Sequence, residues 1–383
     1  MYGSYLPGFK GGGPIRSLVN LVDWLGGLFS FQIITSNHDF NEKEPYPGIE
    51  TAIWQTVGGA QVMYLSPRQM SLAAWHKYLQ NIEYDFIYLN SYFDLQTRRI
   101  LILRRLGMIP DKPVVMAPRG QFSPGALGLK RLKKQLYILF AMRFGLYDNL
   151  IWQATNEHEK HDILLTLGRF VPDLAQRIRI APNLGSRVKM HESKNPSRKK
   201  NSSSIRIVFL SRISRKKNLD YGLRLLSCVG GDVVFDIYGP IEDRAYWEEC
   251  KSILNKLPSN IHVSFRGEIH PHQVHTTLSQ YHLFLFPTRG ENFGHVILEA
   301  MTAGCMILIS DQTPWRGLAE KKVGWDIALS KQDRFKEILQ ICVAMSDDEF
   351  MAWSNCATIY AQNFIESHSS SALQSYRNLF SVI

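Results

Sequence analysis

The chain has 383 residues, of which 45% are hydrophobic and 20% charged, a composition typical of a globular protein with room for two domains. No apolar run reaches the ~18 residues that a membrane-spanning helix needs, and the first residues lack the basic start and apolar centre of a secretory signal. The formal net charge of +10 indicates an anionic partner, such as a nucleic acid, a phosphorylated ligand or a membrane surface.

The first half of the chain alternates helical patterns with short β-rich runs. After "GGGP" (11–14), apolar residues recur at helical spacing from Ile15 to Leu25, which predicts a helix. Strands are expected at 31–36, 62–65, 86–90, 113–117 and 149–155.

The second half repeats this alternation. Strands are expected at 205–211, 233–239, 261–265, 283–288 and 305–310. Nearly continuous apolar strands between helices predict parallel sheets covered on both faces. Between the halves, 192–204 has no apolar residue and should be a solvated linker. The expected fold is α/β, with two doubly wound, Rossmann-like domains facing across a cleft, where such domains bind ligands.

The five cysteines lie in the second half with no paired CxxC spacing, which predicts reduced, buried thiols in a cytoplasmic protein. Clustered metal ligands and an Asp-x-Asp pair are missing from the sequence, so no metal site is expected. Three histidines fall in one Pro-containing turn that we interpret as solvated: His270, His272 and His275.

The stretch "PTRGENFGHVILEAMTAGC" (287–305) places Glu291 in a turn after a buried strand and Glu299 inside the following helix. Free backbone N–H groups at a helix start favour a bound anion, so a phosphate site with carboxylates for sugar hydroxyls is one interpretation. A capped amphipathic helix with a solvated acid is equally compatible with this stretch alone. The N–H groups in question belong to Asn292, Phe293 and Gly294.

A second motif favours the phosphate interpretation. Arg212 and Lys217 flank the turn between the first strand and the first helix of the second domain, which suits a diphosphate. Arg215 and Lys216 are expected to be solvated. The glycines of "GGGPIRS" (11–17) allow close approach of a ligand, a weak signal by itself.

Taken together, "GGGPIRSLVNL", "SRISRKKNLDYGL", "YGP", "VSFRGEI" and "ENFGHVILEAMTAGCMILISDQTPW" resemble the retaining glycosyltransferases of family four, which have the GT-B fold. The resemblance covers nearly the whole chain. "PRGQFSPGAL", "QATNEHEKHDI" and "APNLG" look like a branch that builds bacterial surface polysaccharides, such as lipopolysaccharide, capsule or exopolysaccharide.

The resemblance implies a division of labour between domains. Residues 1–190 would be the acceptor side, 191–204 the linker and 205–365 the nucleotide-sugar side, with a helix near 366–383 packing back on the first domain. A GDP- or UDP-linked hexose would be the donor substrate, with no separate cofactor, and a glycan or lipid-linked molecule the acceptor.

The resemblance also implies a role for each motif residue. Glu299 would bind the donor ribose, and Glu291 a hydroxyl of the transferred sugar, beside the main chain of 292–294. Arg212 and Lys217 would hold the diphosphate, whose leaving phosphate takes the acceptor's proton. The remaining donor contacts would come from Gly267 and Glu268 at the base, and from Gly12 and Gly13 facing the diphosphate or acceptor.

The chain departs from the family pattern at two places. Asn90 stands where many relatives carry a histidine near the sugar, so the acceptor side would rely on the phosphate, on Arg119 or on another residue. The chain opens on "MYGSYLPGF", near the end of the strand with which relatives begin, so the central strand of the first sheet is expected to be truncated.

The basic charge is concentrated in the first domain. Lys130, Arg131, Lys133 and Lys134 precede an apolar helical stretch, and such segments lie on anionic membrane surfaces. A helix packed on its own sheet, with lysines in solvent, is the alternative. A peripheral place on the cytoplasmic face of the inner membrane is therefore expected if the acceptor is lipid-linked.

The sequence is less consistent with three other classes of protein. A basic, non-enzymatic nucleic-acid- or membrane-binding protein on the same scaffold is the main alternative, but no recognition motif or aromatic interleaving supports nucleic acid. A nicotinamide-dependent dehydrogenase lacks its G-x-G-x-x-G turn. A silent scaffold is disfavoured by the intact set of motif residues.

Overall fold

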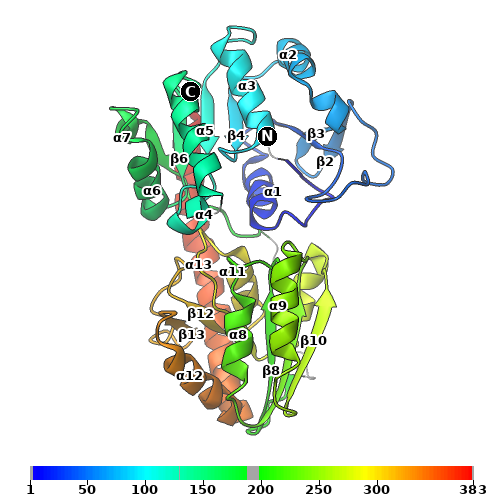
Figure 1. The fold of residues 1–383 in the computed structure, drawn as a ribbon, viewed down its shortest axis with the longest axis vertical. Helices are drawn as coiled ribbons and strands as arrows, with labels where there is room; N and C mark the ends of the chain where they lie inside the picture. The colour runs from blue at the N-terminus through cyan, green and yellow to red at the C-terminus, as the bar shows by residue number, and fades with distance from the viewer. Residues whose placement is uncertain (1–2, 129, 188–197, 382–383) are drawn as a thin grey trace. The chain divides into compact units, whose positions relative to one another are not determined.

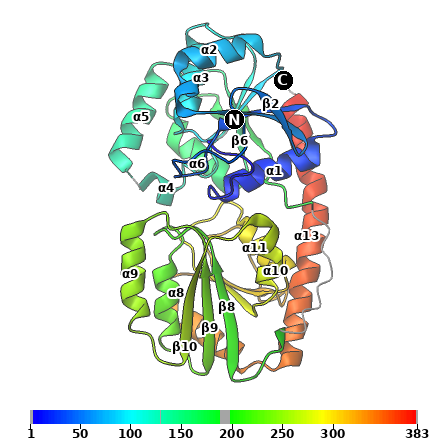
Figure 2. The ribbon, with the colours of Figure 1, turned by 90° about the vertical axis from the view of Figure 1, so that its right-hand side faces the viewer.

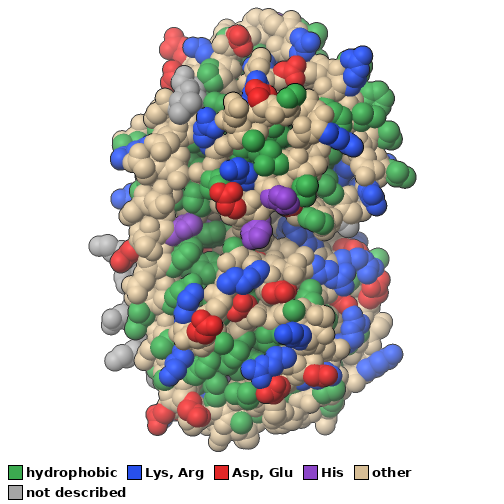
Figure 3. Space-filling model, turned by 90° about the vertical axis from the view of Figure 1, so that its left-hand side faces the viewer, with side chains coloured by type: hydrophobic (Ala, Val, Ile, Leu, Met, Phe, Trp, Pro, Cys, Tyr) green, Lys and Arg blue, Asp and Glu red, His purple; other side chains and the backbone are tan. Residues whose placement is uncertain are grey.

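The computed structural model describes residues 3–128, 130–187 and 198–381. The chain divides into two compact units, one comprising Met1–Arg187 and His368–Ile383 (unit 1) and the other Val188–Ser367 (unit 2) (Figure 1). The expected linker falls largely outside the described residues, so its extent stays a prediction. Lys and Arg side chains are spread over the face drawn in Figure 3, with hydrophobic side chains exposed between them.

Unit 2 contains one six-stranded sheet in the order β10-β9-β8-β11-β12-β13, with every paired strand parallel. The order corresponds to the doubly wound arrangement 3-2-1-4-5-6, so the expected fold class is confirmed for this unit. The strands are β8 Ser204–Leu210, β9 Asp232–Tyr238, β10 Ile261–Gly267, β11 Leu283–Phe286, β12 Met306–Ser310 and β13 Gly324–Ile327.

Helices cover both faces of this sheet. Figure 2 shows α8 and α9 on one face and α10 and α11 on the other. The helices are α8 Leu219–Leu226, α9 Arg244–Leu254, α10 Val274–Leu278, α11 His295–Thr302 and α12 Gln332–Ala344. Coverage on both sides explains why β11 and β12 consist almost entirely of buried apolar residues.

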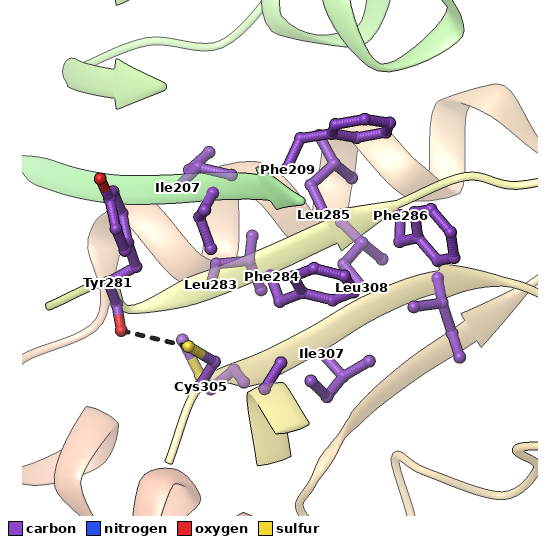
Figure 4. Close-up of a cluster of buried hydrophobic side chains, with 14 of the residues drawn as sticks. Ile207, Phe209, Tyr281, Leu283, Phe284, Leu285, Phe286, Cys305, Ile307 and Leu308 are labelled. Atoms are coloured by element: carbon purple, nitrogen blue, oxygen red, sulfur yellow. Dashed lines mark hydrogen bonds between the residues drawn. The ribbon is translucent and has the colours of Figure 1, made fainter. Parts of the chain in front are cut away.

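The core of unit 2 is one contiguous hydrophobic cluster. Figure 4 shows side chains of neighbouring strands interdigitating within it, among them Phe209, Leu285 and Leu308. Cys305 lies at its edge, where its thiol donates to the Tyr281 carbonyl oxygen at 3.6 Å, and burial raises the pKa of this thiol to about 11. All five cysteines are unpaired, but the expectation of buried thiols is wrong for Cys228, which is exposed, and holds only in part for Cys356, which is half-buried.

Unit 1 contains two separate sheets, ordered β1-β3-β2 and β4-β5-β6-β7. The strands are β1 Phe31–Ser36, β2 Trp54–Val57, β3 Ala60–Leu65, β4 Ile87–Asn90, β5 Val114–Ala117, β6 Ile151–Ala154 and β7 Ile178–Ile180. All pairs are parallel except β2 with β3, which form a hairpin. β2, β7 and β13 were not predicted, because each is short and a polar residue interrupts its apolar residues.

The helices of unit 1 position the residues that follow these strands. They are α1 Gly13–Leu25, α2 Leu72–Asn81, α3 Leu95–Arg105, α4 Pro124–Gly128, α5 Arg131–Arg143, α6 Glu157–Leu167 and α7 Leu174–Arg177. No strand precedes α1 in the described residues 3–12.

The chain ends in α13, a helix of 35 residues over Asp347–Ser381. Its last turns belong to unit 1, where Tyr376, Leu379 and Phe380 are buried in a cluster with Leu21 and Leu25 of α1. The Phe380 ring stacks on Phe86 with centroids 4.8 Å apart. The C-terminal segment is therefore part of the core of unit 1.

Candidate active site

The loop after β11 and the helix that follows it contain the motif of residues 287–305. The loop leads from the buried strand through Glu291 to Gly294, which caps α11 with φ +77°. A Cβ atom at Gly294 would lie 2.8 Å from Ile297 Cδ1, so the turn needs glycine both for its backbone and for space. The helix itself begins at His295, and Gly304, with φ +73°, follows its last turn.

Hydrogen bonds from neighbouring loops hold this turn in place. Glu291 N donates to the Gln312 carbonyl oxygen at 2.8 Å. The Trp315 indole donates to the Phe293 carbonyl oxygen at 2.7 Å, and both side chains are buried. The loop after β12 therefore fixes the backbone on which the expected donor contacts lie.

The loop after β8 is joined to the same turn by Asn218, which is buried with φ +61°. Its amide donates to the Pro287 carbonyl oxygen at 2.8 Å, and its Oδ1 accepts from Arg289 Nε at 3.0 Å. Arg289 N also donates to the Lys216 carbonyl oxygen at 2.8 Å. Because β8 and β11 are adjacent, their two loops meet at the carboxyl edge of the sheet.

This meeting brings together two of the residues expected to be catalytic. Lys217 Nζ forms an ion pair with Glu291 Oε1, and both side chains are largely buried. Burial alone raises the pKa of the Glu291 carboxyl, but the charges of Lys217, Lys216 and Arg212 outweigh it and hold the pKa below its ordinary value. Glu291 is thus ionised at neutral pH and surrounded by cations.

Lys216 departs from expectation. Its side chain is partly buried, and its Cε lies 3.6 Å from where a Cβ of Gly290 would stand. The pKa of the Lys216 ammonium group is lowered, mainly by burial. The negative charge of Glu291 opposes this shift, and the positive charges of Lys217 and Arg212 add to it. The expectation of a solvated lysine is wrong here, because the turn folds its stem against Gly290.

The other two cations of the turn lie further out. Arg215 is exposed and pairs with Glu249 and Asp243, in agreement with its expected place in solvent. Arg212 pairs with Glu242 at 3.0 Å and remains partly exposed. Arg212 therefore lies at the rim of the cationic group formed with Lys216 and Lys217.

Three further donor-side candidates, Glu299, Glu268 and Gly267, lie on the same unit. Glu299 is partly exposed in the middle of α11, and Glu268 is exposed just after β10. Gly267 has φ +75° with no atom within 4 Å of a Cβ position, so this strand end is open. Its carbonyl oxygen accepts a hydrogen bond from Gly239 N at 2.8 Å. A Cβ atom at Gly239 would collide with the Ser211 carbonyl oxygen, at 1.9 Å. Only glycine fits at position 239.

The acceptor-side candidates form a network in unit 1. Arg119, with φ +57°, donates from Nε to Asn90 Oδ1 at 2.9 Å and from its terminal nitrogens to Asn183 Oδ1 at 2.6 Å and Tyr88 Oη at 2.7 Å. Asn90 is buried and its Nδ2 has no hydrogen-bond partner in the described part of the chain. Asn90 thus orients Arg119 and does not present its amide to solvent.

Gly12 and Gly13 lie at the start of α1, also in unit 1. Gly12 caps the helix with φ +69°, and its carbonyl oxygen accepts from Arg16 N at 3.2 Å. Gly13 is exposed, and its carbonyl oxygen accepts from Ser17 Oγ at 3.0 Å. The helix start is thus a glycine turn, as the sequence predicts.

Sequence reasoning missed several residues of these two sites. Asn218 follows Lys217 directly and Trp315 lies in "DQTPW", so both stand inside stretches that carried the resemblance. Nothing in the sequence marks Asn183 or Tyr88 as neighbours of Arg119, because the network joins the ends of separate strands.

Within the described ranges 3–128, 130–187 and 198–381, no three His, Cys, Asp or Glu side chains cluster as metal ligands. The His270 and His272 rings stack with centroids 5.7 Å apart, and the side chain of His275 lies 3.4 Å from the Thr302 carbonyl oxygen. No helix in these ranges is long and apolar enough to cross a bilayer.

Two α/β units, one with a cationic loop pair at the carboxyl edge of its sheet, define a fold class, GT-B, which solved glycosyltransferases share. Anabaena HepE, solved with UDP and glucose, matches with 15% identity and a TM-score of 0.70, over 100% of this chain and 98% of that one. Sucrose-phosphate synthase from Thermosynechococcus elongatus matches with 15% identity and a TM-score of 0.71, over 97% and 94%. WaaG, a glycosyltransferase involved in lipopolysaccharide biosynthesis, matches with 16% identity and a TM-score of 0.63, over 97% of each chain.

At such identities these likenesses establish the fold. Residues 190–347 match the family model described as Glycosyl transferases group 1, so this part of the chain is a domain of that family. The shared fold confirms the expected GT-B fold, whereas the family match covers less than half of the chain, so membership of the whole chain in family four stays a prediction. A search among curated proteins found no match.

Proposed function

We propose that the chain is a retaining, metal-independent hexosyltransferase that uses a UDP- or GDP-linked sugar. The acceptor is a lipid-linked molecule or an oligosaccharide in bacterial lipopolysaccharide, capsule or exopolysaccharide synthesis. The observation that carries the proposal is the Lys217–Glu291 pair at the carboxyl edge of β8 and β11, beside the start of α11.

In the proposed site, Lys217 and Glu291 separate when the donor binds, and each takes a new partner. A diphosphate beside the loop draws Lys217 towards its own charge, which releases Glu291 to accept from a hydroxyl of the transferred sugar. Lys216 and Arg212 add positive charge on the same loop, where the leaving phosphate develops negative charge. That phosphate then takes the acceptor's proton, so no side-chain base is required.

The donor lies along the sheet edge in this proposal. β10 is three strands from β11, about 14 Å at the usual strand spacing. A base at Gly267 and Glu268, a ribose at Glu299 and a sugar at Glu291 therefore suit an extended nucleotide sugar. HepE has been solved with UDP-glucose and with UDP and glucose, which supports a nucleotide-sugar donor here.

The acceptor side is assigned to Arg119, oriented by Asn90 and Asn183, with Gly12 and Gly13 facing the diphosphate or the acceptor. WaaG acts in lipopolysaccharide biosynthesis, which supports a surface-polysaccharide acceptor. A guanidinium held by neutral amide groups keeps its charge available for an anionic or hydroxylated acceptor.

Helix α5 supports a peripheral membrane location, on the cytoplasmic face in this proposal. Its inward face buries Ile138, Ala141 and Met142, yet the opposite face is apolar too. The exposed fractions of five apolar side chains on or directly after the helix lie between 50% and 75%: Leu132, Leu136, Leu139, Phe140 and Phe144. A helix packed on its own sheet with only lysines in solvent does not expose such a stripe.

The surrounding cations are not equivalent. Lys130, Arg131 and Lys133 are exposed, as expected for contacts with anionic headgroups. Lys134 turns inward, where its Nζ donates to the Ala126 carbonyl oxygen at 2.6 Å and lies 5.1 Å from the centre of the Phe93 ring. Lys134 is therefore not expected to contact the membrane, unlike Lys130, Arg131 and Lys133.

Calorimetry and activity assays with two variants test the donor site. Glu299→Ala should weaken binding of UDP or GDP itself, whereas Glu291→Ala should leave nucleotide binding intact and lower sugar transfer. The anomeric proton signal of the transferred sugar in the glycosidic product, observed by NMR, should report retained configuration, and transfer should persist with a chelator present. Unchanged nucleotide affinity of the Glu299 variant would contradict the assignment.

The alternative, a basic non-enzymatic protein that binds nucleic acid or membrane on a GT-B scaffold, makes the opposite prediction. It requires no affinity for nucleotide sugars, and the same calorimetry separates the two.

A further inference from the structure

The guanidinium group of Arg119 is held at all three of its nitrogen atoms. Nε donates to Asn90, and the two terminal nitrogens donate to Asn183 Oδ1 at 2.6 Å and to Tyr88 Oη at 2.7 Å. These contacts use three of the five N–H bonds of the group, so two have no partner among the described residues. The direction of those two bonds depends on what holds Tyr88 and Asn183 in place.

The backbone of Arg119 is fixed independently of these contacts. Its φ of +57° is uncommon for a residue other than glycine, and Gly120 continues the turn with φ +72°. Gly120 N donates to the carboxylate of buried Glu159, which also accepts from Thr155 N at 2.8 Å. The side-chain contacts therefore determine only where the guanidinium points.

A buried amide, Gln153 of β6, sets the direction of the Tyr88 hydroxyl. Gln153 Nε2 lies 2.7 Å from the Ala181 carbonyl oxygen, which can only accept, so this end of the amide is the donor. The other end, Gln153 Oε1, then accepts from the Tyr88 hydroxyl. This leaves Tyr88 Oη as an acceptor for Arg119, whose nitrogens can only donate.

The same amide binds the last turns of α13. Gln153 Nε2 also donates to the Tyr376 hydroxyl at 2.9 Å, and both side chains are buried. One turn further along α13, the Phe380 ring meets the Tyr88 ring edge to face, with centroids 5.6 Å apart. α13 thus holds Tyr88 both through Gln153 and through direct ring contact.

α13 also contacts the loop that carries Asn183. His368 Nε2 lies 3.1 Å from the Asn183 carbonyl oxygen and donates to it, since a carbonyl oxygen can only accept. One residue further, the Leu184 carbonyl oxygen accepts from Asn20 of α1 at 2.8 Å. Two of the three partners of Arg119 are therefore held by α13.

We propose that Tyr376 and His368 are positioning residues of the acceptor site. They act through Gln153 and Asn183, and they aim the two remaining N–H bonds of Arg119 at an oxygen-bearing group of the acceptor. The proposal rests on the proposed function, in which Arg119 binds the acceptor. A guanidinium that loses these supports rotates away from the fixed fork geometry that binds two oxygens at once.

The test compares two buried tyrosines of unit 1. Tyr376→Phe removes the hydroxyl that accepts from Gln153 and keeps the ring. Tyr147→Phe is the matched control, because the Tyr147 hydroxyl is also buried and donates to the Tyr92 carbonyl oxygen at 2.9 Å, apart from the contacts of Arg119. Both changes are made in the unmodified chain and in the Arg119→Lys variant.

The first measurement needs no substrate. The Nε–H signal of Arg119, identified in arginine-labelled protein by its loss in Arg119→Lys, reports by NMR how fast this hydrogen exchanges with solvent. Tyr376→Phe should speed this exchange by about fivefold or more, the usual equivalent of one lost hydrogen bond. Tyr147→Phe should leave it unchanged. Unchanged exchange in Tyr376→Phe, or equal acceleration in both variants, would overturn the proposal.

The second measurement is sugar transfer from labelled UDP- and GDP-sugars to a membrane extract of the source cells. Tyr376→Phe should raise the apparent KM for the extract by about fivefold or more, with the Kd for UDP or GDP unchanged. In the Arg119→Lys variant it should cost nothing further, because Tyr376 acts through the guanidinium. An equal loss with and without Arg119 would mean that Tyr376 supports only the fold.

His368 gives a second, independent variant in case Tyr376→Phe lowers Tm more than its control does. His368→Leu should also speed exchange at Arg119, and His368→Gln, whose amide can still donate to the Asn183 carbonyl oxygen, should restore it. Equal exchange in these two variants would contradict the role of His368. If the unmodified chain transfers no sugar, the proposed function fails, whereas the NMR signal still decides whether α13 positions Arg119.

Discussion

Three lysine and arginine side chains of one loop differ in what they contact, and their effects on catalysis should differ accordingly. Lys217 pairs with buried Glu291, and Arg212 lies at the rim of the same cationic group. Replacing either by Ala should lower sugar transfer by about 100-fold, the usual cost of removing a group that stabilises developing charge. Arg215→Ala, the matched control, should cost little, because Arg215 is exposed and paired with Glu249.

Lys216 provides the sharper comparison. Since its side chain lies against Gly290 within the field of Glu291, Lys216→Ala should lower transfer more than Arg215→Ala does. Initial rates with saturating donor measure all four variants. Equal losses would mean that the turn is merely basic and that the loop geometry has no catalytic consequence.

His282 should make the stability of unit 2 depend on pH. Burial lowers its pKa to about 3, helped by the nearby charges of Arg198 and Lys200, and its Nδ1 accepts from Arg206 N at 2.9 Å. In the unfolded chain His282 takes up a proton as pH falls through about 6.5, whereas in the folded chain it stays neutral down to about pH 3. The contribution of neutral His282 to the free energy of unfolding is therefore complete above pH 6.5. It is lost as pH falls towards 3, at about 1.4 kcal/mol per pH unit.

Urea unfolding at pH 6.5 and pH 5 measures this effect, which should amount to about 2 kcal/mol for the unmodified chain. His282→Asn, whose Oδ1 can replace Nδ1 as the acceptor, should flatten the dependence. His262→Asn is the control, since His262 is exposed beside Asp232. An unchanged slope in the His282 variant would refute the assignment.

At the scale of elements, α5 should attach the protein to anionic vesicles. Its exposed apolar stripe would enter the acyl region while three cations contact headgroups, at about 1 kcal/mol each. Flotation should show binding that needs anionic lipid and weakens with salt, as the Debye length shrinks from about 10 Å at 0.1 M to about 3 Å at 1 M. Changing Lys130, Arg131 and Lys133 together to Gln should release the protein.

The matched control removes three exposed lysines from unit 2, by changing Lys251, Lys256 and Lys331 to Gln. This variant has the same net charge as the α5 variant but keeps the stripe with its cations, so it should stay bound. Both variants should retain nucleotide binding, since the proposed donor contacts from 212 to 299 lie on unit 2. Equal binding to neutral and anionic vesicles, or none to either, would end the membrane hypothesis.

At the scale of the whole molecule, donor binding should appear as a gain in thermal stability. A ligand at 100 times its Kd stabilises the folded state by about 2.7 kcal/mol. A screen of UDP- and GDP-sugars should therefore find one base that raises Tm, with Glu299→Ala losing the shift. No shift with any nucleotide sugar at millimolar concentration would favour the non-enzymatic alternative.

The sequence by itself determined most of the strands and the motif loops. Runs such as 283–286 and 306–309 are apolar throughout because both faces of their sheet are covered, and this pattern is local. The spacing of Glu291 and Glu299 around Gly294 is also local, since a strand, a glycine turn and a helix follow directly. The short strands β7 and β13 were not predicted, because a charged residue interrupts the apolar residues of each.

Only the tertiary structure decided which of these residues meet. Lys217 and Glu291 are 74 residues apart in the chain and pair because β8 and β11 are neighbours in the sheet. Arg119 contacts Asn183 for the same kind of reason, across the ends of different strands. Burial of Lys216, the inward turn of Lys134 and the outward stripe of α5 likewise depend on what packs against each face. A linear pattern does not contain that information, because it arises from contacts between residues distant in the chain.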